Sequence, residues 1–101
     1  MTTRMTRHRF YIGEQVAEGT RYVSPEQWDR VEQWIASLAG GWTVYQVQGK
    51  WNGKQESSRV FEVIADPALL NTARRIAEKV RDLAEQTCVL WTHEECQGEF
   101  V

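Results

Sequence analysis

Residues 42–64 decide the fold, and they read WTVYQVQGKWNGKQESSRVFEVI. Asn52 and Gly53 stand in the middle of this stretch, and this pair tolerates positive φ at both central positions of a type I′ turn. Apolar, aromatic and β-branched residues flank the pair on both sides, which is typical of strands. The stretch therefore predicts a β-hairpin with strands at 42–51 and 54–64.

A two-residue turn also sets the register of the hairpin, because Trp51 must then face Lys54. The other facing pairs are Val47 with Ser58, Tyr45 with Val60, Val44 with Phe61, and Trp42 with Val63. Facing residues share one side of a sheet, so each pair is assigned to a common face.

A helix start precedes the hairpin. Ser24 is a favourable N-cap, Pro25 suits the first helical position, and Gln27 stands where its side chain reaches back to the cap. Apolar residues then recur at helical spacing until Gly40 and Gly41 end the helix. These apolar residues are Trp28, Val31, Ile35 and Leu38.

A second amphipathic helix follows the hairpin. Asp66 and Pro67 repeat the combination of cap and proline, and the helical pattern continues to about Gln86. Its apolar positions are Leu69, Ala73, Ile76, Ala77, Val80 and Leu83. Residues 8–12 and 87–93 are predicted to form the first and last strands.

The predicted elements follow the order β-α-β-β-α-β. The compact solution for this order is an antiparallel sheet with both helices on one face, the ferredoxin-like arrangement of the α+β class. A chain of 101 residues is long enough to bury one hydrophobic core. We expect a single domain over 1–101, with an ordered core over about 8–93 and a C-terminal tail over 94–101.

The composition is that of a globular domain with little net charge. The chain has 12 Lys and Arg against 14 Asp and Glu, a net charge of −2. This argues against bulk nucleic-acid binding, which needs many cations on one face. No apolar run is long enough to span a bilayer or to act as a signal peptide. We therefore expect a cytoplasmic chain with no membrane partner. Cys88 and Cys96 are too few for a disulfide framework and are expected to be reduced thiols.

Both faces of the predicted sheet carry apolar residues, although the helices cover only one face. An antiparallel sheet with a solvated face normally alternates apolar and polar residues. We therefore predict that the uncovered face packs against a second copy of the chain, in a homodimer or homotrimer. The predicted interface residues are Tyr45, Val47, Val60 and Leu90, with Trp34 of the first helix as a further anchor. The alternative is that an open face tolerates scattered apolar residues.

The hairpin also carries a resemblance to known proteins. Residues 41–51 fit the pattern G-x-T-V-Y-x-x-x-G-x-W, with VSPEQW at 23–28 and VFEVIAD at 60–66. In these motifs the chain resembles a widespread kind of small bacterial α+β protein over about residues 10–93, which implies a fold and no chemistry. Its topology and length resemble those of PII-like signalling proteins, trimers of ferredoxin-like subunits that bind nucleotides. The tight turn at 52–53 replaces that family's long loop, so this second resemblance is one of fold alone.

One end of the predicted sheet combines cations with aromatic rings. The loop before the first helix and the hairpin turn should meet there, beside the N-terminus of that helix. Free N–H groups and the positive end of the helix dipole attract anions. The candidate ligand-binding residues are Arg21, Tyr22, Lys50, Trp51 and Lys54. They predict a site for a small anionic, nucleotide-like ligand; the alternative is a solvated loop end where Trp51 packs across the hairpin.

His8 and His93 are expected at neighbouring ends of the first and last strands, with Cys96 shortly after. Two histidines with a carboxylate or thiolate form a common metal site. Histidines at strand ends are, however, more often surface residues, and this spacing is not diagnostic of a metal. We predict no metal and no cofactor, with these three residues as the candidates if a metal is bound.

The sequence contains no Gly-rich phosphate loop and no nucleophile with an assignable histidine base. Core packing accounts for Trp28, Trp42 and Trp91, and the mixed charges of 74–85 fit a solvated helix face. We therefore expect a non-enzymatic regulator or sequestering protein, with its enzyme status open. One alternative is a small dimeric ferredoxin-like enzyme with a pocket between sheet and helices. Another is a protein-binding inhibitor or adaptor, marked by an exposed tryptophan.

Overall fold

The computed structural model describes residues 2–17 and 21–101, apart from the side chain of Trp51. Its elements are β1 (Thr3–Gly13), α1 (Pro25–Ala36), β2 (Thr43–Trp51), β3 (Lys54–Ala65), the short 3-10 helix η1 (Pro67–Leu69), α2 (Leu70–Leu83) and β4 (Leu90–Gly98). Within these residues, neither α1 nor α2 has the length and apolar character that crossing a membrane requires.

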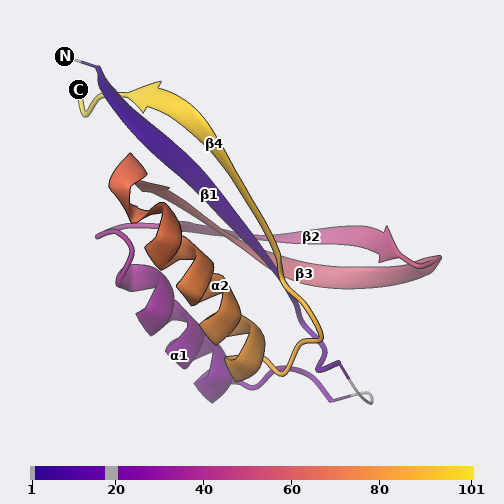
Figure 1. The fold of residues 1–101 in the computed structure, drawn as a ribbon. Helices are drawn as coiled ribbons and strands as arrows, with labels where there is room; N and C mark the ends of the chain where they lie inside the picture. Colours follow the sequence, from indigo (N-terminus) through magenta and orange to yellow (C-terminus); the bar gives the residue numbers. More distant parts are fainter. Residues whose placement is uncertain (1, 18–20) are drawn as a thin grey trace.

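The four strands form one antiparallel sheet in the order β2-β3-β1-β4. Both helices pack side by side on the same face of this sheet (Figure 1). The protein therefore belongs to the α+β class, as the order of the predicted elements indicates. We call the face without helices the open face.

The predicted register of the hairpin is confirmed from the Trp51–Lys54 pair to the Val44–Phe61 pair. The turn at 52–53 has φ values of 50° and 78°, as a type I′ turn requires. Local turn chemistry therefore settles the pairing of β2 with β3.

The outer part of the hairpin extends past the rest of the sheet. Pairing between β1 and β3 ends at Gly13 with Ser58, whereas pairing between β2 and β3 continues to Trp51 with Lys54. The hairpin tip therefore projects away from the helices, and the molecule is elongated, with extents of 48 × 26 × 23 Å (Figure 1).

Both predicted helix starts are confirmed. The N–H of Gln27 donates to the hydroxyl of Ser24 at 3.1 Å, and the N–H of Ser24 donates to the side-chain oxygen of Gln27 at 2.9 Å. This reciprocal pair is a capping box. At the second start, the N–H of Ala68 donates to the carboxylate of Asp66 at 2.8 Å. That cap begins η1, which leads directly into α2.

The end of α2 differs from the prediction, because the helix stops at Leu83 and not near Gln86. The N–H of Gln86 donates to the carbonyl of Arg81 at 2.9 Å, and the N–H of Glu85 donates to the carbonyl of Asp82 at 3.1 Å. These bonds form a Schellman motif, whose residue of positive φ is usually glycine. Here Glu85 takes a φ of 52°, so no glycine marks the helix end in the sequence.

The first and last strands of the chain, β1 and β4, are longer than predicted. β1 starts at Thr3, and β4 runs from Leu90 to Gly98, through much of the segment predicted as a tail. Where β1 and β4 extend beyond their predicted ends, Nε of Arg4 donates to the carboxylate of Glu95 at 2.8 Å. Charged and polar residues dominate these extended parts of the two strands. They lack the alternation of apolar and polar residues that predicts a strand, so the sequence pattern does not reveal these strand ends.

The core lies between the sheet and the two helices. Its most buried side chains, each at most 2% exposed, include Phe10, Ile12, Val31, Ile35, Phe61, Val63, Ile76 and Val80. Trp28 joins this core at 5% exposure, as predicted. The predicted core role of Trp42 is wrong: it is 37% exposed, because it stands just before β2, an edge strand with a neighbour on one side only.

Candidate functional site

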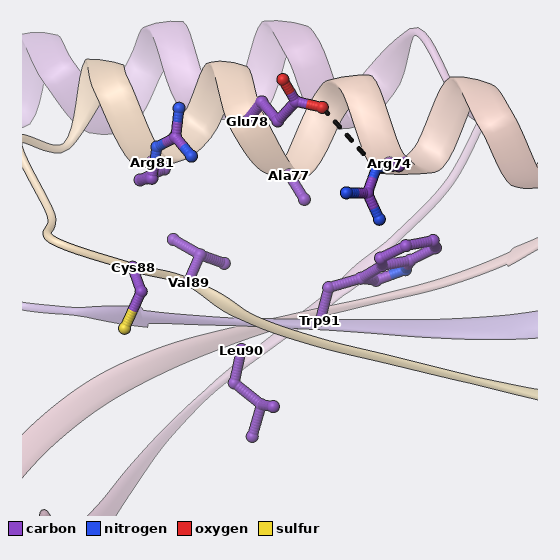
Figure 2. A pocket seen from close by; sticks show the side chains of 8 residues that line it. All are labelled: Arg74, Ala77, Glu78, Arg81, Cys88, Val89, Leu90 and Trp91. Carbon is purple, nitrogen blue, oxygen red and sulfur yellow. Dashed lines mark ion pairs between the residues drawn. The ribbon is translucent and has the colours of Figure 1, made fainter.

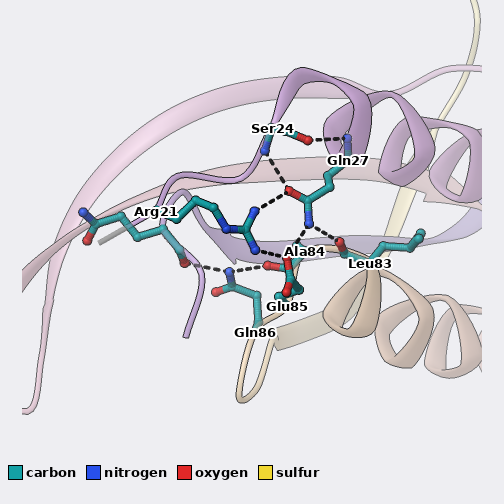
Figure 3. A network of polar contacts seen from close by, with 8 residues as sticks. Arg21, Ser24, Gln27, Leu83, Ala84, Glu85 and Gln86 are labelled. Atoms are coloured by element: carbon teal, nitrogen blue, oxygen red, sulfur yellow. Dashed lines mark hydrogen bonds and ion pairs between the residues drawn. The ribbon is translucent and has the colours of Figure 1, made fainter. Parts of the chain in front are cut away.

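Arg21, the first of the predicted ligand residues, lies against the C-terminal end of α2. Its guanidinium pairs with Glu85, and its Nη1 donates to Oε1 of Gln27 at 3.4 Å (Figure 3). Gln27 donates in turn to Glu85 and to the carbonyl of Leu83, both at 2.9 Å. The hydrogen bonds from Arg21 and then Gln27 hold the pKa of Glu85 below its ordinary value. The network ties the start of α1 to the end of α2.

A hollow of about 380 Å³ lies beside this network. It is lined by Val16, Ala17, Arg21, Glu85, Gln86 and Thr87. Arg21 is the positively charged residue among the described residues that line the hollow, and its charge is paired with that of Glu85. The hollow therefore offers little free positive charge to an anion.

The other predicted ligand residues whose side chains the structure describes are Tyr22, Lys50 and Lys54, and all three are exposed. Tyr22 is 65% exposed. Lys50 and Lys54 are exposed on the projecting part of the hairpin, which Figure 1 shows away from the helices. The side chain of Trp51 lies outside the described residues. A ligand site built from these five residues stays a prediction.

The four predicted interface residues of the strands lie on the open face. Leu90 is 58% exposed, Tyr45 is 36% exposed, and Val47 is half-buried. Val60 is fully buried, because it lies between Tyr11 on β1 and Tyr45 on β2. Val60 is thus covered within a single copy of the chain, whereas Leu90 and Tyr45 leave apolar surface uncovered.

Four charged side chains occupy the middle of the open face. Arg9 donates to Glu62 at 2.8 Å and to Glu94 at 3.3 Å, and Arg7 donates to Glu94 at 3.2 Å. The hydrogen bond to Glu62 raises the pKa of Arg9 further above its ordinary value. Two cations and two carboxylates balance, so the centre of the open face carries no net charge.

Trp34, the fifth predicted interface residue, lies on α1 and is 40% exposed. The Nζ atom of Lys79 on α2 lies 5.6 Å from the centre of its ring, within reach of a cation–π interaction. Trp34 therefore belongs to the helical side of the molecule, across the sheet from the open face.

The three candidate metal ligands do not share a face. His8 and His93 face each other on the helix side of the sheet, with ring centres 6.2 Å apart. Cys96 stands an odd number of residues after His93 on the same strand, which places it on the open face. Within the described residues, no group of three or more His, Cys, Asp or Glu is arranged to hold a metal ion.

A groove of about 320 Å³ between α2 and β4 combines an aromatic wall with two cations (Figure 2). Its lining residues are Arg74, Ala77, Glu78 and Arg81 of α2, Cys88 and Val89 just before β4, and Leu90 and Trp91 at the start of β4. Arg74 points toward the indole ring of Trp91, whereas Leu90 points away from α2 (Figure 2).

The helix supplies one side of the groove through its spacing. Arg74, Ala77, Glu78 and Arg81 stand at i, i+3, i+4 and i+7, so they lie along one face of α2. The short side chain of Ala77 leaves space between the two arginines. The residue spacing of α2 therefore forms one side of the groove, and β4, which packs against that face of the helix, forms the other.

A hydrogen bond to His8 on the neighbouring strand β1 fixes the position of the Trp91 indole. Its Nε1–H donates to Nδ1 of His8 at 3.1 Å, and the two rings are stacked 16° from parallel. His8 is fully buried, and burial followed by the nearby His93 lowers the pKa of its imidazole. His8 is therefore neutral near pH 7, as an acceptor at Nδ1 must be.

The two arginines of the groove each have a carboxylate partner on α2. Nε of Arg74 lies 3.9 Å from Glu78, and Nε of Arg81 lies 3.0 Å from Asp82. Exposed pairs of this kind contribute about 0–1 kcal/mol, so an anionic ligand can replace them. The groove thus offers an aromatic face beside two exchangeable guanidinium groups.

Trp91 was not among the site residues predicted from the sequence, because strand alternation assigns it to the core. Alternation shows which face a residue occupies and does not show whether a helix covers it fully. A usable signal was the spacing of Arg74, Ala77 and Arg81, which puts two cations around a small residue on one helix face.

No family model matches the chain, and no curated protein matches it. Among solved structures, it is similar to a phage SAM lyase in complex with S-methyl-5′-thioadenosine, with 17% identity and a TM-score of 0.66 over 90% of this chain and 81% of the lyase chain. The apo state of a phage SAM lyase gives 15% identity and a TM-score of 0.64 over 91% and 81% of the two chains. At such identities the likeness shows that this chain shares the fold of the phage SAM lyase.

Proposed function

We propose that the chain is a non-enzymatic, homo-oligomeric protein that binds a small anionic, nucleotide-like ligand in the groove between α2 and β4. The observation that carries this proposal is the fixed indole of Trp91 facing the guanidinium of Arg74. Stacking of a base on an aromatic ring contributes about 1–3 kcal/mol. Arginine recognises phosphate and carboxylate groups through paired N–H donors.

Adenosine is the nucleoside we propose. The support is the phage SAM lyase of similar fold, which was solved with S-methyl-5′-thioadenosine. A volume of about 320 Å³ is near the lower end for small-molecule sites, about 300–1,000 Å³. This size favours a nucleoside or nucleoside monophosphate over a dinucleotide.

Titration calorimetry with adenosine 5′-monophosphate tests the proposal. We expect the parent chain to bind it, Trp91→Leu to lose binding, and Arg74→Gln to weaken it about tenfold or more, as loss of a charge-assisted hydrogen bond does. Arg75→Gln is the matched control, because Arg75 is an exposed arginine of α2 outside the groove lining. No binding by the parent, or equal weakening by Arg74→Gln and Arg75→Gln, overturns the proposal.

A second candidate function is an enzyme that acts on a sulfonium nucleoside in the same groove. The likeness to the phage SAM lyase over 90% of this chain favours it. Glu78 supplies a carboxylate there, although the two arginines leave the lining with a net positive charge. Incubation with S-adenosylmethionine and chromatography for S-methyl-5′-thioadenosine separates the two functions, because a binding protein releases no product.

The assembly we propose is a homodimer or homotrimer that forms through the open face. Leu90 and Tyr45 leave apolar surface on this face, and Ile64 is also 36% exposed there. The balanced charges at its centre, Arg9 and Glu62 among them, avoid repulsion between two copies.

The finer description of the fold is also a proposal. Strand order β2-β3-β1-β4 with both helices on one face supports a ferredoxin-like arrangement, and the order of the elements is β-α-β-β-α-β apart from η1. A cytoplasmic location stays a prediction, which the two free cysteines, Cys88 and Cys96, support.

A further inference from the structure

The hydrogen bond between His8 and Trp91 requires a neutral imidazole. Nδ1 of His8 accepts the indole N–H at 3.1 Å, so this nitrogen carries no proton. The proton of the neutral ring must then sit on Nε2, which is buried without a hydrogen-bond partner. A second proton on His8 would place an N–H donor against the N–H of Trp91 and break the bond.

The surroundings of His8 offer little to stabilise its charged form. Phe10 and Trp91 stack beside the ring, and Val63 faces His8 from β3. On β4, His93 adds repulsion once it is charged. Glu95 shares the same face two residues further along β4, and Arg4 already pairs with it. The charged side chains of the flanking sheet positions, Arg7, Arg9, Glu62 and Glu94, belong to the open face.

The helices add no compensating charge at the buried ring. α2 buries Ala73, Ile76 and Val80 in the core, and α1 buries Trp28, Val31 and Ile35. The charged residues of α2 that line the groove with Trp91 have partners on the helix: Arg74 pairs with Glu78, and Arg81 pairs with Asp82. η1 contributes Leu69, which packs against the core.

We propose that His8 is the positioning residue that fixes Trp91 as the wall of the groove, and that protonation of His8 releases this wall and weakens ligand binding in acid. The part that concerns binding rests on the proposed function. His8 does not line the groove. It acts through Trp91 and makes binding in the groove dependent on pH.

The indole N–H of Trp91 is a direct reporter of this contact in the ligand-free protein. In a ¹H–¹⁵N spectrum of the full chain, the Trp91 signal is the one that Trp91→Phe removes. As the pH is lowered from about 8, we expect it to move with the same midpoint as the ring nitrogens of His8. A Trp91 signal that stays constant while His8 titrates overturns the inference.

Two variants separate His8 from its neighbour. His8→Asn places an amide oxygen near the position of Nδ1, which can accept from Trp91 without titrating, so the Trp91 signal should become independent of pH. His93→Asn removes the other histidine, and the Trp91 signal should still titrate. Titration that persists in His8→Asn, or that disappears in His93→Asn, contradicts the role of His8. Thermal unfolding of each variant verifies that it is folded.

Binding is then measured with S-methyl-5′-thioadenosine, whose own charge is constant over this range. Between about pH 7.5 and a pH below the midpoint measured for His8, we expect the affinity of the parent to fall about fivefold or more, as the loss of one hydrogen bond implies, and that of His8→Asn to stay constant. Equal affinity at both pH values overturns the inference and leaves the proposed function intact. No binding at either pH, with a Trp91 signal that follows His8, overturns the part of the inference that concerns binding and confines His8 to positioning the indole. The calorimetry with adenosine 5′-monophosphate decides the proposed function separately.

Discussion

The guanidinium carbon of Arg59 lies 4.2 Å from the centre of the Trp28 ring. Arg59 faces Ile12 on the helix side of the sheet, and Trp28 is a buried residue of α1. Nε of Arg59 also lies 3.5 Å from the carboxylate of Glu14. A charged residue thus occupies a helix-facing position of β3, where it joins the outer end of the sheet to α1.

Replacement of Arg59 should destabilise the fold through the loss of this contact. Arg59→Met keeps an apolar stem and removes the charge, and we expect urea unfolding to give a free energy of unfolding about 1 kcal/mol lower. Arg59→Lys keeps the charge without the planar group and should lose less. An equal loss for Arg59→Met in a Trp28→Leu background means that the two side chains are not coupled.

The parts of the fold that the sequence predicts correctly are those set by local chemistry. A turn at 52–53 admits one register for the hairpin, and Ser24 with Gln27 forms its capping box within four residues. The end of α2 escapes prediction because Glu85 adopts a conformation that usually marks glycine. Contacts with Arg21, distant in the sequence, accompany that conformation.

The candidate site is less accessible from sequence than the fold, because it depends on which residues of β4 lie beneath α2. The pattern of β4 assigns Trp91 to the helix side correctly, but its hydrogen bond to His8 joins residues 83 positions apart. The sequence predicts Arg21 as an anion ligand from its positive charge, but it cannot show that a carboxylate of the same chain pairs with that charge. Its partner Glu85 comes from a segment that the sequence assigns to helix.

The contact between Arg21 and Glu85 should give stability a defined dependence on pH. Hydrogen bonds from Arg21 and Gln27 lower the pKa of Glu85 in the folded state. A carboxyl group of this kind stabilises the fold above its unfolded pKa of about 4.3, and that contribution disappears as the pH falls through the lower folded value. We expect Glu85→Gln to lower Tm at pH 7, with a deficit that shrinks below about pH 4.

Scanning calorimetry of the parent and Glu85→Gln at a series of pH values measures this deficit. Arg21→Leu supplies the reference, since Glu85→Gln in that background should show a much weaker dependence on pH. If the Tm deficit of Glu85→Gln depends on pH in the same way with and without Arg21, the effect does not come from the contact between Arg21 and Glu85.

The last prediction concerns the assembly, and the burial of Val60 determines which variant can test it. Val60→Glu would place a charge between Tyr11 and Tyr45 inside one copy, so it would damage the subunit as well as any interface. Val47 is half-buried on the same face, and Val47→Glu should leave the subunit folded. We expect light scattering at about 10 µM to give a dimer or trimer for the parent and the 11.8 kDa monomer for Val47→Glu. Val44→Glu is the matched control, because Val44 is 40% exposed on the opposite face of the same strand and should remain assembled. A parent of 11.8 kDa, or dissociation by both variants alike, means that the open face is not the interface.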